Sequence, residues 1–169
     1  MLIRKEVRGT DPDQIRALVA ATGFFTQEEI GIATELVEEA LNRGVESGYF
    51  LLVAEENDRV LGYTCYGPIP GTDASYDLYW IAVHPEAQGR GLGKTLIVET
   101  EKQIRASGGR RVYIETSSRE QYVPTRRFYL SCGYVQEALL VDFYRPGDSK
   151  VIYSKELPAR ISAAADRRG

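Results

Sequence analysis

The stretch "HPEAQGRGLGKTLIVE", which begins at His84, constrains the fold of this chain more than any other part of the sequence. Its glycines, Gly89, Gly91 and Gly93, occupy every second position. They lie between the apolar run "YDLYWIAV" and a segment with apolar residues at helical spacing. Glycine lets the backbone turn tightly and brings its N–H groups close to an anion, and a helix N-terminus adds partial positive charge. The stretch therefore predicts a strand–turn–helix unit that binds phosphate.

Spacing separates the phosphate motifs that share these residue types. A Walker loop, G-x-x-x-x-G-K-[ST], needs a glycine where the chain has Gln88, although "GKT" is present at its end. A dinucleotide fingerprint, G-x-G-x-x-G, needs its third glycine where the chain has Lys94 or Leu96. The pattern that fits is Q-x-x-G-x-G, formed by Gln88, Gly91 and Gly93.

The rest of the chain is predicted to form helices and strands of a mixed α/β domain. Asp11 is the expected N-cap of a first helix, with Pro12 at its first helical position, and Thr26 and Glu29 form the capping box of a second. Alternating and apolar runs predict strands in "LIRKEV", "YFLLVAEENDRVLGYTCYG" (two), "YDLYWIAV", "RRVYIETSS", "YVQEALLVDFY" and "KVIYSKEL". Further helices follow the glycine turn and occupy "VPTRRFYLSCG", so the order is βααβββαβαββ.

Length and charge define the class of protein. The 169 residues fit one domain, which we expect to span residues 1–157, followed by a polar tail over residues 158–169. The net charge of −3, with acidic and basic residues interleaved, argues against a nucleic-acid partner. No apolar run approaches the roughly 20 residues that span a bilayer, and the N-terminus lacks the apolar core of a signal peptide. We therefore expect a cytoplasmic protein with no membrane partner.

The cysteines and the histidine limit the chemistry. Cys65 and Cys132 lie far apart in the sequence and form no metal-ligand pattern, so we expect reduced thiols and no metal site. Because His84 is the only histidine, a histidine-based catalytic triad and a multi-histidine metal site are excluded. His84 directly precedes Pro85 at the end of a strand, which is typical of a turn residue.

Two motifs resemble those of one enzyme superfamily. "IAVHPEAQGRGLGKTL" is similar to the acetyl-CoA pyrophosphate motif, and "RRFYLSCGY" to the later F-Y-x-x-x-G-[FY] motif, of the GNAT superfamily, the Gcn5-related N-acetyltransferases. The resemblance covers residues 1 to about 157. It implies an α/β fold with a mixed, mostly antiparallel seven-stranded sheet and helices on both faces. Two central parallel strands, "YDLYWIAV" and "RRVYIETSS", would splay apart.

The resemblance also implies an acetyltransferase that forms no covalent enzyme intermediate. Acetyl-CoA would lie between the splayed strands, and a primary amine of a small molecule or peptide would attack its thioester directly. The backbone N–H near Val83 would donate to the thioester oxygen, and Tyr129 would protonate the departing thiolate as general acid. The positions that the resemblance assigns to acetyl-CoA are Ile81, Ala82, Val83, Gln88, Gly89, Arg90, Gly91, Leu92, Gly93, Lys94, Tyr122, Thr125, Phe128 and Tyr129.

The general base and the acceptor site are less determined. Asp77, on the strand before the glycine turn, is the preferred base, while Glu115 on the next strand or a water chain are the alternatives. Tyr122 stands where many family members carry an asparagine that contacts the pantetheine arm, so it either bonds this arm or stacks near the adenine. Phe24 and Phe25, in the loop "TGFFTQEE", are the aromatic residues expected to wall the acceptor site.

Two other functions fit parts of the sequence. A non-catalytic acyl-CoA-binding or sensor domain would share the fold, but the presence of Tyr129 favours catalysis. A P-loop-like nucleotide hydrolase is disfavoured by Gln88 at the glycine position. The sequence leaves the acceptor amine open, from peptide N-termini and lysines to polyamines and aminoglycosides, and the exposed last strands are compatible with a homodimer.

Overall fold

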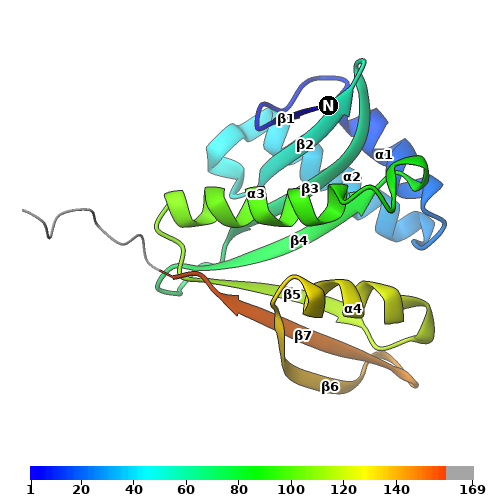
Figure 1. The fold of residues 1–169 in the computed structure, drawn as a ribbon, viewed down its shortest axis with the longest axis vertical. Helices are drawn as coiled ribbons and strands as arrows, with labels where there is room; N and C mark the ends of the chain where they lie inside the picture. The colour runs from blue at the N-terminus through cyan, green and yellow to red at the C-terminus, as the bar shows by residue number, and fades with distance from the viewer. Residues whose placement is uncertain (159–169) are drawn as a thin grey trace, which may run out of the picture.

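The computed structural model describes residues 1–158 and folds them into one seven-stranded sheet with helices on both faces (Figure 1). The predicted order βααβββαβαββ is confirmed, whereas the predicted tail, apart from Pro158, lies outside the described residues. The strands are β1 (Leu2–Arg4), β2 (Phe50–Glu56), β3 (Arg59–Pro68), β4 (Ser75–Val83), β5 (Arg111–Ser117), β6 (Val135–Arg145) and β7 (Asp148–Glu156). The helices are α1 (Asp11–Ala21), α2 (Gln27–Arg43), α3 (Leu92–Ala106) and α4 (Val123–Ser131), with short 3₁₀ turns η1 (Gly44–Ser47), η2 (Pro85–Ala87) and η3 (Glu120–Tyr122).

The sheet order is β1-β2-β3-β4-β5-β7-β6, and every neighbouring pair is antiparallel except β4 and β5. The parallel pairing of β4 with β5 begins at Ser75 and Arg111 and ends at Asp77 and Tyr113, after three register pairs. Beyond Asp77 the two strands continue without pairing and diverge, as Figure 1 shows. The predicted pair of splayed central strands is therefore confirmed.

A bulge in β4 changes which residues face each side of the sheet. Trp80 pairs with Cys65, while Leu78 pairs with the next residue of β3, so Tyr79 has no partner in the register. An extra residue of this kind reverses the alternation of side chains beyond it. As a result Leu78 and Ile81 both pack on the side of α3, although they are an odd number of residues apart, while Trp80 packs with the opposite core.

Two apolar cores lie on the two faces of the sheet. Helices α3 and α4 cover the front face in Figure 1, where Leu96 and Ile104 of α3 pack against strand residues such as Tyr153. Helices α1 and α2 cover the rear face, where Ile15 and Val37 pack against β2 and β3. None of the helices within residues 1–158 has the length and apolar character needed to span a bilayer.

A buried ion network ties the N-terminal strand to α1 and β2. Asp11 was predicted to cap α1, but it is the first helical residue, and Thr10 in the N-cap position makes no side-chain cap. Instead the Asp11 carboxylate accepts from the Arg4 guanidinium at 2.6 and 2.8 Å and from the Arg8 backbone N–H at 2.7 Å. Arg4 Nε also donates to Glu55 at 2.8 Å, which holds the pKa of that carboxyl below its usual range. The N-cap prediction was wrong because this pairing turns the carboxylate toward Arg4.

We predict that Asp11→Asn destabilises the fold strongly, because it leaves the buried Arg4 guanidinium without its closest carboxylate. Breaking a buried pair in this way costs about 3 kcal/mol of the free energy of unfolding. Urea denaturation at neutral pH measures the loss. The matched control is Asp13→Asn, which removes an exposed carboxylate from the same helical turn. Equal losses in the two variants would contradict a special role for the buried pair.

Candidate active site

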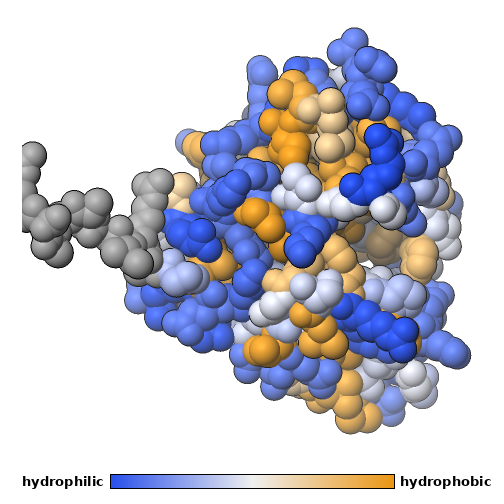
Figure 2. All heavy atoms as spheres, viewed as in Figure 1, coloured by the Kyte–Doolittle hydropathy of each residue, from blue (hydrophilic) through white to orange (hydrophobic). Residues whose placement is uncertain are grey.

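A cleft of about 740 Å³ opens where β4 and β5 diverge. In Figure 2 the surface is indented at the right of the view, between the half of the sheet that contains β4 and the half that contains β5. The lining comes from the α1–α2 loop, the end of β4, the glycine turn, the end of β5, α4 and the β6–β7 hairpin. The lining residues are Thr22, Phe24, Phe25, Glu29, Tyr79, Trp80, Ile81, Ala82, Val83, Ala87, Gln88, Gly89, Gly91, Leu92, Gly93, Lys94, Glu115, Thr116, Ser117, Arg119, Tyr122, Pro124, Thr125, Phe128, Tyr129, Ser131, Tyr144, Arg145 and Asp148.

The structure brings nearly all of the predicted cofactor positions to this one cleft. Arg90 is the exception: it is exposed in the glycine turn and does not line the cleft. Phe24 and Phe25, which were expected to wall the acceptor site, line the cleft from the α1–α2 loop. Asp77, the preferred base, does not line it.

The glycine turn leaves the N-terminus of α3 open toward the cleft. Gly89 and Gly91 have φ values of 73° and 79°, a region that favours glycine, and Gly91 is the N-cap of α3 without a side-chain cap. Gln88 Nε2 donates to the Val83 carbonyl at 3.1 Å, which ties the turn to the end of β4. A Cβ on Gly93 would lie 3.3 Å from the Phe128 ring, so α3 and α4 approach closely here. The turn therefore presents unused backbone N–H groups and a helix dipole to the cleft.

His84 is a structural residue at the entry to this turn. Its Nδ1 accepts from the Glu86 backbone N–H at 3.3 Å, which caps η2. Its Nε2 lies 3.1 Å from Arg59 Nη2, and Arg59 also pairs with Glu86 at 2.8 Å. The prediction that His84 serves the turn is confirmed.

Tyr129 presents a buried phenol to the cleft from α4. Its ring packs 5.9 Å from the ring of Tyr153 and 6.3 Å from that of Tyr134, centroid to centroid. Burial raises the pKa of Tyr129 well above its usual value, so the hydroxyl stays protonated at neutral pH. Because Tyr129 lines the cleft, the proton of its hydroxyl is within reach of a ligand there.

Two carboxylates, Asp77 and Glu115, lie near the point where β4 and β5 diverge. Asp77 is half-buried at the last register pair of β4 with β5, opposite Tyr113, and does not line the cleft. Burial raises the pKa of Asp77 to about 6, with Glu115 raising it further and Lys150 lowering it. Glu115 does line the cleft, and its carboxylate pairs with Lys150 Nζ at 2.6 Å. Of the two carboxylates, Glu115 lines the cleft and Asp77 does not.

A second charged group in the cleft was not predicted from the sequence. The buried Asp148 carboxylate accepts from the Ser117 hydroxyl and pairs with Arg119 Nε at 3.1 Å and Arg145 Nε at 3.8 Å. The sequence predicts a turn in "RPGD", which contains Asp148, and a strand in "RRVYIETSS", which contains Ser117. Nothing in these two segments indicates that Asp148 and Ser117 meet. The contact forms because β5 and β7 are neighbours in the sheet.

Aromatic contacts close the mouth of the cleft. The rings of Phe24, in the α1–α2 loop, and Tyr122, at the start of α4, lie 6.0 Å apart in an edge-on contact. The Arg119 guanidinium lies 5.5 Å from the Tyr122 ring centroid. Phe25 packs at 4.9 Å on Trp80 of β4, which anchors the loop to the strand. The α1–α2 loop therefore reaches across the opening from the β4 side to the β5 side.

A family model described as an acetyltransferase (GNAT) domain matches residues 46–136, more than half of the chain. The chain belongs to the GNAT acetyltransferase family. Its GNAT fold matches the crystal structure of a GNAT-family protein from Desulfovibrio desulfuricans with a TM-score of 0.90 and 48% sequence identity. That match covers 92% of this chain and 98% of the other.

Two further relatives are more distant. An aminoglycoside 6'-N-acetyltransferase, whose structure holds coenzyme A, matches this GNAT domain with a TM-score of 0.74 at 19% identity, which shows the shared fold. The match covers 94% of this chain and 98% of that one. The mycothiol acetyltransferase of Rhodococcus jostii is 31% identical over 103 residues, 58% of this chain. The aligned part spans only 34% of that protein.

We predict that the Asp77 carboxyl titrates near pH 6 in the free protein, where carbon-detected NMR of labelled carboxyl groups can follow it. Glu115→Gln removes a neighbouring negative charge and should lower this pKa, whereas Lys150→Met removes a positive charge and should raise it. Glu137→Gln, on β6, is the matched control and should leave Asp77 unchanged. A wild-type titration near pH 4 would contradict the buried position of this carboxyl.

Proposed function

We propose that this chain is an N-acetyltransferase that moves the acetyl group of acetyl-CoA to a primary amine by direct attack, with no covalent enzyme intermediate. The observation that carries the proposal is one cleft that combines an uncapped, glycine-lined helix N-terminus with a buried, protonated phenol. The amine belongs to a small molecule or a peptide. The domain responsible would span residues 1–157, because β7, which completes the core beside β5, ends at Glu156.

The cofactor-binding part of the proposal rests on unused backbone groups. The open N-terminus of α3 would hold the pyrophosphate through the backbone from Gln88 to Lys94, and the Lys94 ammonium adds a full charge there. Beyond Asp77, β4 has no strand partner on the side of β5, so Ile81 to Val83 are free to bond the amide groups of the pantetheine arm. Tyr122, Thr125 and Phe128 would cover the arm from α4. Arg90 is exposed and does not line the cleft, so it would contribute only at long range.

The catalytic roles follow from position and charge. The backbone N–H near Val83 would donate to the thioester oxygen as negative charge develops there. Tyr129 would give its proton to the departing thiolate, acting as general acid. The amine proton would leave toward the Glu115 carboxylate on the wall, with Asp77 linked behind it through water. The pKa of about 6 makes Asp77 ionised at neutral pH and more basic than an ordinary aspartate.

A non-catalytic acyl-CoA sensor is the second candidate, because the open helix N-terminus alone would bind the cofactor. The protonated Tyr129 hydroxyl favours the enzyme, since a sensor has no need of a proton donor in the cleft. Measurement of transfer, rather than of binding, separates the two.

We predict that acetyl-CoA and CoA raise the melting temperature of the protein and that ATP does not. A ligand at a hundred times its Kd adds about 2.7 kcal/mol to the free energy of unfolding, which is readily measured by thermal denaturation. The Gln88–Gly93 spacing, which departs from a Walker loop, is the reason to expect no effect of ATP. Stabilisation by ATP alone would refute the acetyltransferase proposal.

We predict that Tyr129→Phe lowers kcat by roughly a hundredfold or more, because it removes the general acid, while CoA affinity stays near that of the wild type. Free-thiol release with an amine panel gives kcat, and calorimetric titration gives the affinity. Tyr153→Phe is the matched control, because this neighbouring buried tyrosine does not line the cleft. A parallel loss of affinity and turnover would argue against the acid role.

A further inference from the structure

We infer that the acceptor carries an anionic group besides its amine, and that Arg119 and Arg145 bind this group at the wall formed by β5 and β7. The inference rests on the proposed function and names the class of acceptor: a primary amine with a carboxylate elsewhere in the molecule. It starts from the charged group around Asp148, which neither the general acid nor the cofactor site uses.

The arginine pair is built on a buried support. The Asp148 side chain is only 3% exposed and is fixed by the Ser117 hydroxyl, whereas the Arg119 and Arg145 side chains are 36% and 63% exposed. The Asp148 carboxylate lies 3.1 Å from Arg119 Nε and 3.8 Å from Arg145 Nε, so it draws both guanidiniums toward one part of the cleft wall. The cleft therefore has an anion-binding wall whose position is set from inside the protein.

The pair retains charge and donors for a ligand. Two guanidiniums and one carboxylate leave a net positive charge, and both contacts to Asp148 are made through Nε. Among residues 1–158, no hydrogen bond uses the terminal nitrogens of Arg119 or Arg145. Such nitrogens form the fork that binds a carboxylate in a bidentate manner.

This wall is separate from the glycine turn that binds pyrophosphate in the proposed function. On β5 and β7, Ile114 and Val151 face the core beneath α3 and α4, so Ser117 and Asp148 lie on the opposite face of the sheet. The glycine turn leads into α3, on the first of these faces. The two cationic sites thus serve opposite sides of the opening, and the one at Asp148 lies on the side left for the acceptor.

A negative group for the amine lies on the same face. Glu115 precedes Ser117 by two residues on β5, so their side chains point the same way, roughly 7 Å apart along the strand. Asp77 and Glu115 together outweigh the one charge of Lys150 beside them. An acceptor with an ammonium and a carboxylate several bonds apart would match both charged groups of the wall. Its amine would lie toward Glu115 and its carboxylate toward Arg119 and Arg145.

The test compares amino acids with their carboxamides as acceptors, at fixed acetyl-CoA. The acidic probes are γ-aminobutyrate and ε-aminocaproate, whose lengths bracket the spacing between Glu115 and Ser117 along β5. Each is compared with its own carboxamide. A third probe, n-butylamine, has an amine and no acid. We expect kcat/KM for the acids to exceed that for the amides by roughly tenfold, in line with a charge-assisted pair. Arg145→Gln should abolish this preference through KM, and Arg145→Lys should retain part of it.

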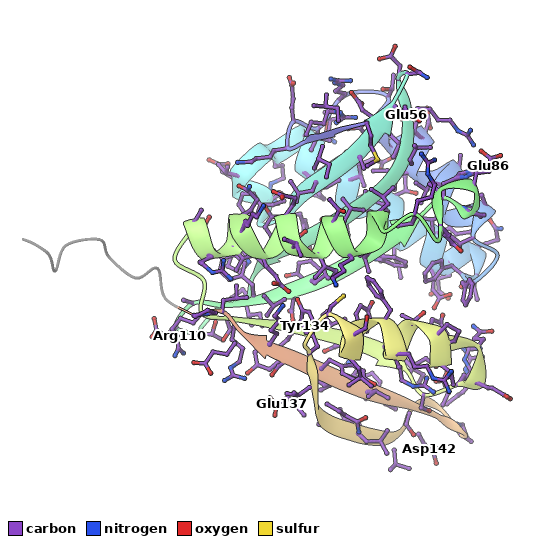
Figure 3. All side chains as sticks on the ribbon, viewed as in Figure 1. Glu56, Glu86, Arg110, Tyr134, Glu137 and Asp142 are labelled. Atoms are coloured by element: carbon purple, nitrogen blue, oxygen red, sulfur yellow. The ribbon has the colours of Figure 1, made fainter. Side chains whose placement is uncertain are left out.

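Arg110→Gln is the matched control, because Arg110 is exposed and lies at the far end of the sheet from Glu86 and the cleft mouth (Figure 3). It should leave the preference unchanged. Arg119→Gln is a second variant that should also abolish the preference. If the loss of the Asp148–Arg119 pair prevents this variant from folding, Arg145→Gln still tests the inference, because the Arg145 side chain is exposed.

The outcomes separate this inference from the proposed function. Equal kcat/KM for acids and amides, or acetylation of n-butylamine without acetylation of either acid, overturns the inference and leaves the acetyltransferase intact. A loss of CoA affinity in Arg145→Gln that is absent with dephospho-CoA also overturns it, since the arginines would then hold a cofactor phosphate. Failure of the wild type to bind acetyl-CoA, or to transfer to any amine, counts against the proposed function itself.

Discussion

Three backbone register pairs hold β4 to β5, and the position at which this pairing stops determines where the cleft opens. A parallel pair that continued to Val83 and Ser117 would fill the cleft with strand hydrogen bonds. Because it stops at Asp77, the last residues of β4 keep their N–H and C=O groups on one side without strand partners. Such groups need an alternative partner in the interior of a sheet, and the amide groups of the proposed cofactor would supply it.

The surrounding structure stabilises this interrupted sheet from both sides. β5 makes seven register pairs with β7. These pairs hold β5 in place on the side that faces away from β4. In the half of the sheet that contains β4, the bulge at Tyr79 places the Ile81 and Val83 side chains on the face covered by α3. The two cores, one under each pair of helices, then make the divergence of the strands a rigid feature of the fold.

Local features were predictable and distant pairings were not. The glycine turn, from Gln88 to Lys94, is contiguous, so spacing alone indicated a strand–turn–helix unit and an anion site. Asp77 lies on the predicted strand, at the last pair of β4 with β5, and only the structure shows that Glu115, the alternative base, lines the cleft while Asp77 does not. Ser117 and Asp148 are 31 residues apart, and only the β5–β7 register brings them together.

The aromatic contact between Phe24 and Tyr122 has a mechanical meaning. It joins the β4 half of the molecule to the β5 half at the open end, opposite the short seam of three pairs. An edge-on ring pair contributes only about 1 kcal/mol, and it has neither charge nor direction as strict as a hydrogen bond. The two half-sheets are therefore joined at one end by strand hydrogen bonds and at the open end by a single weak ring pair.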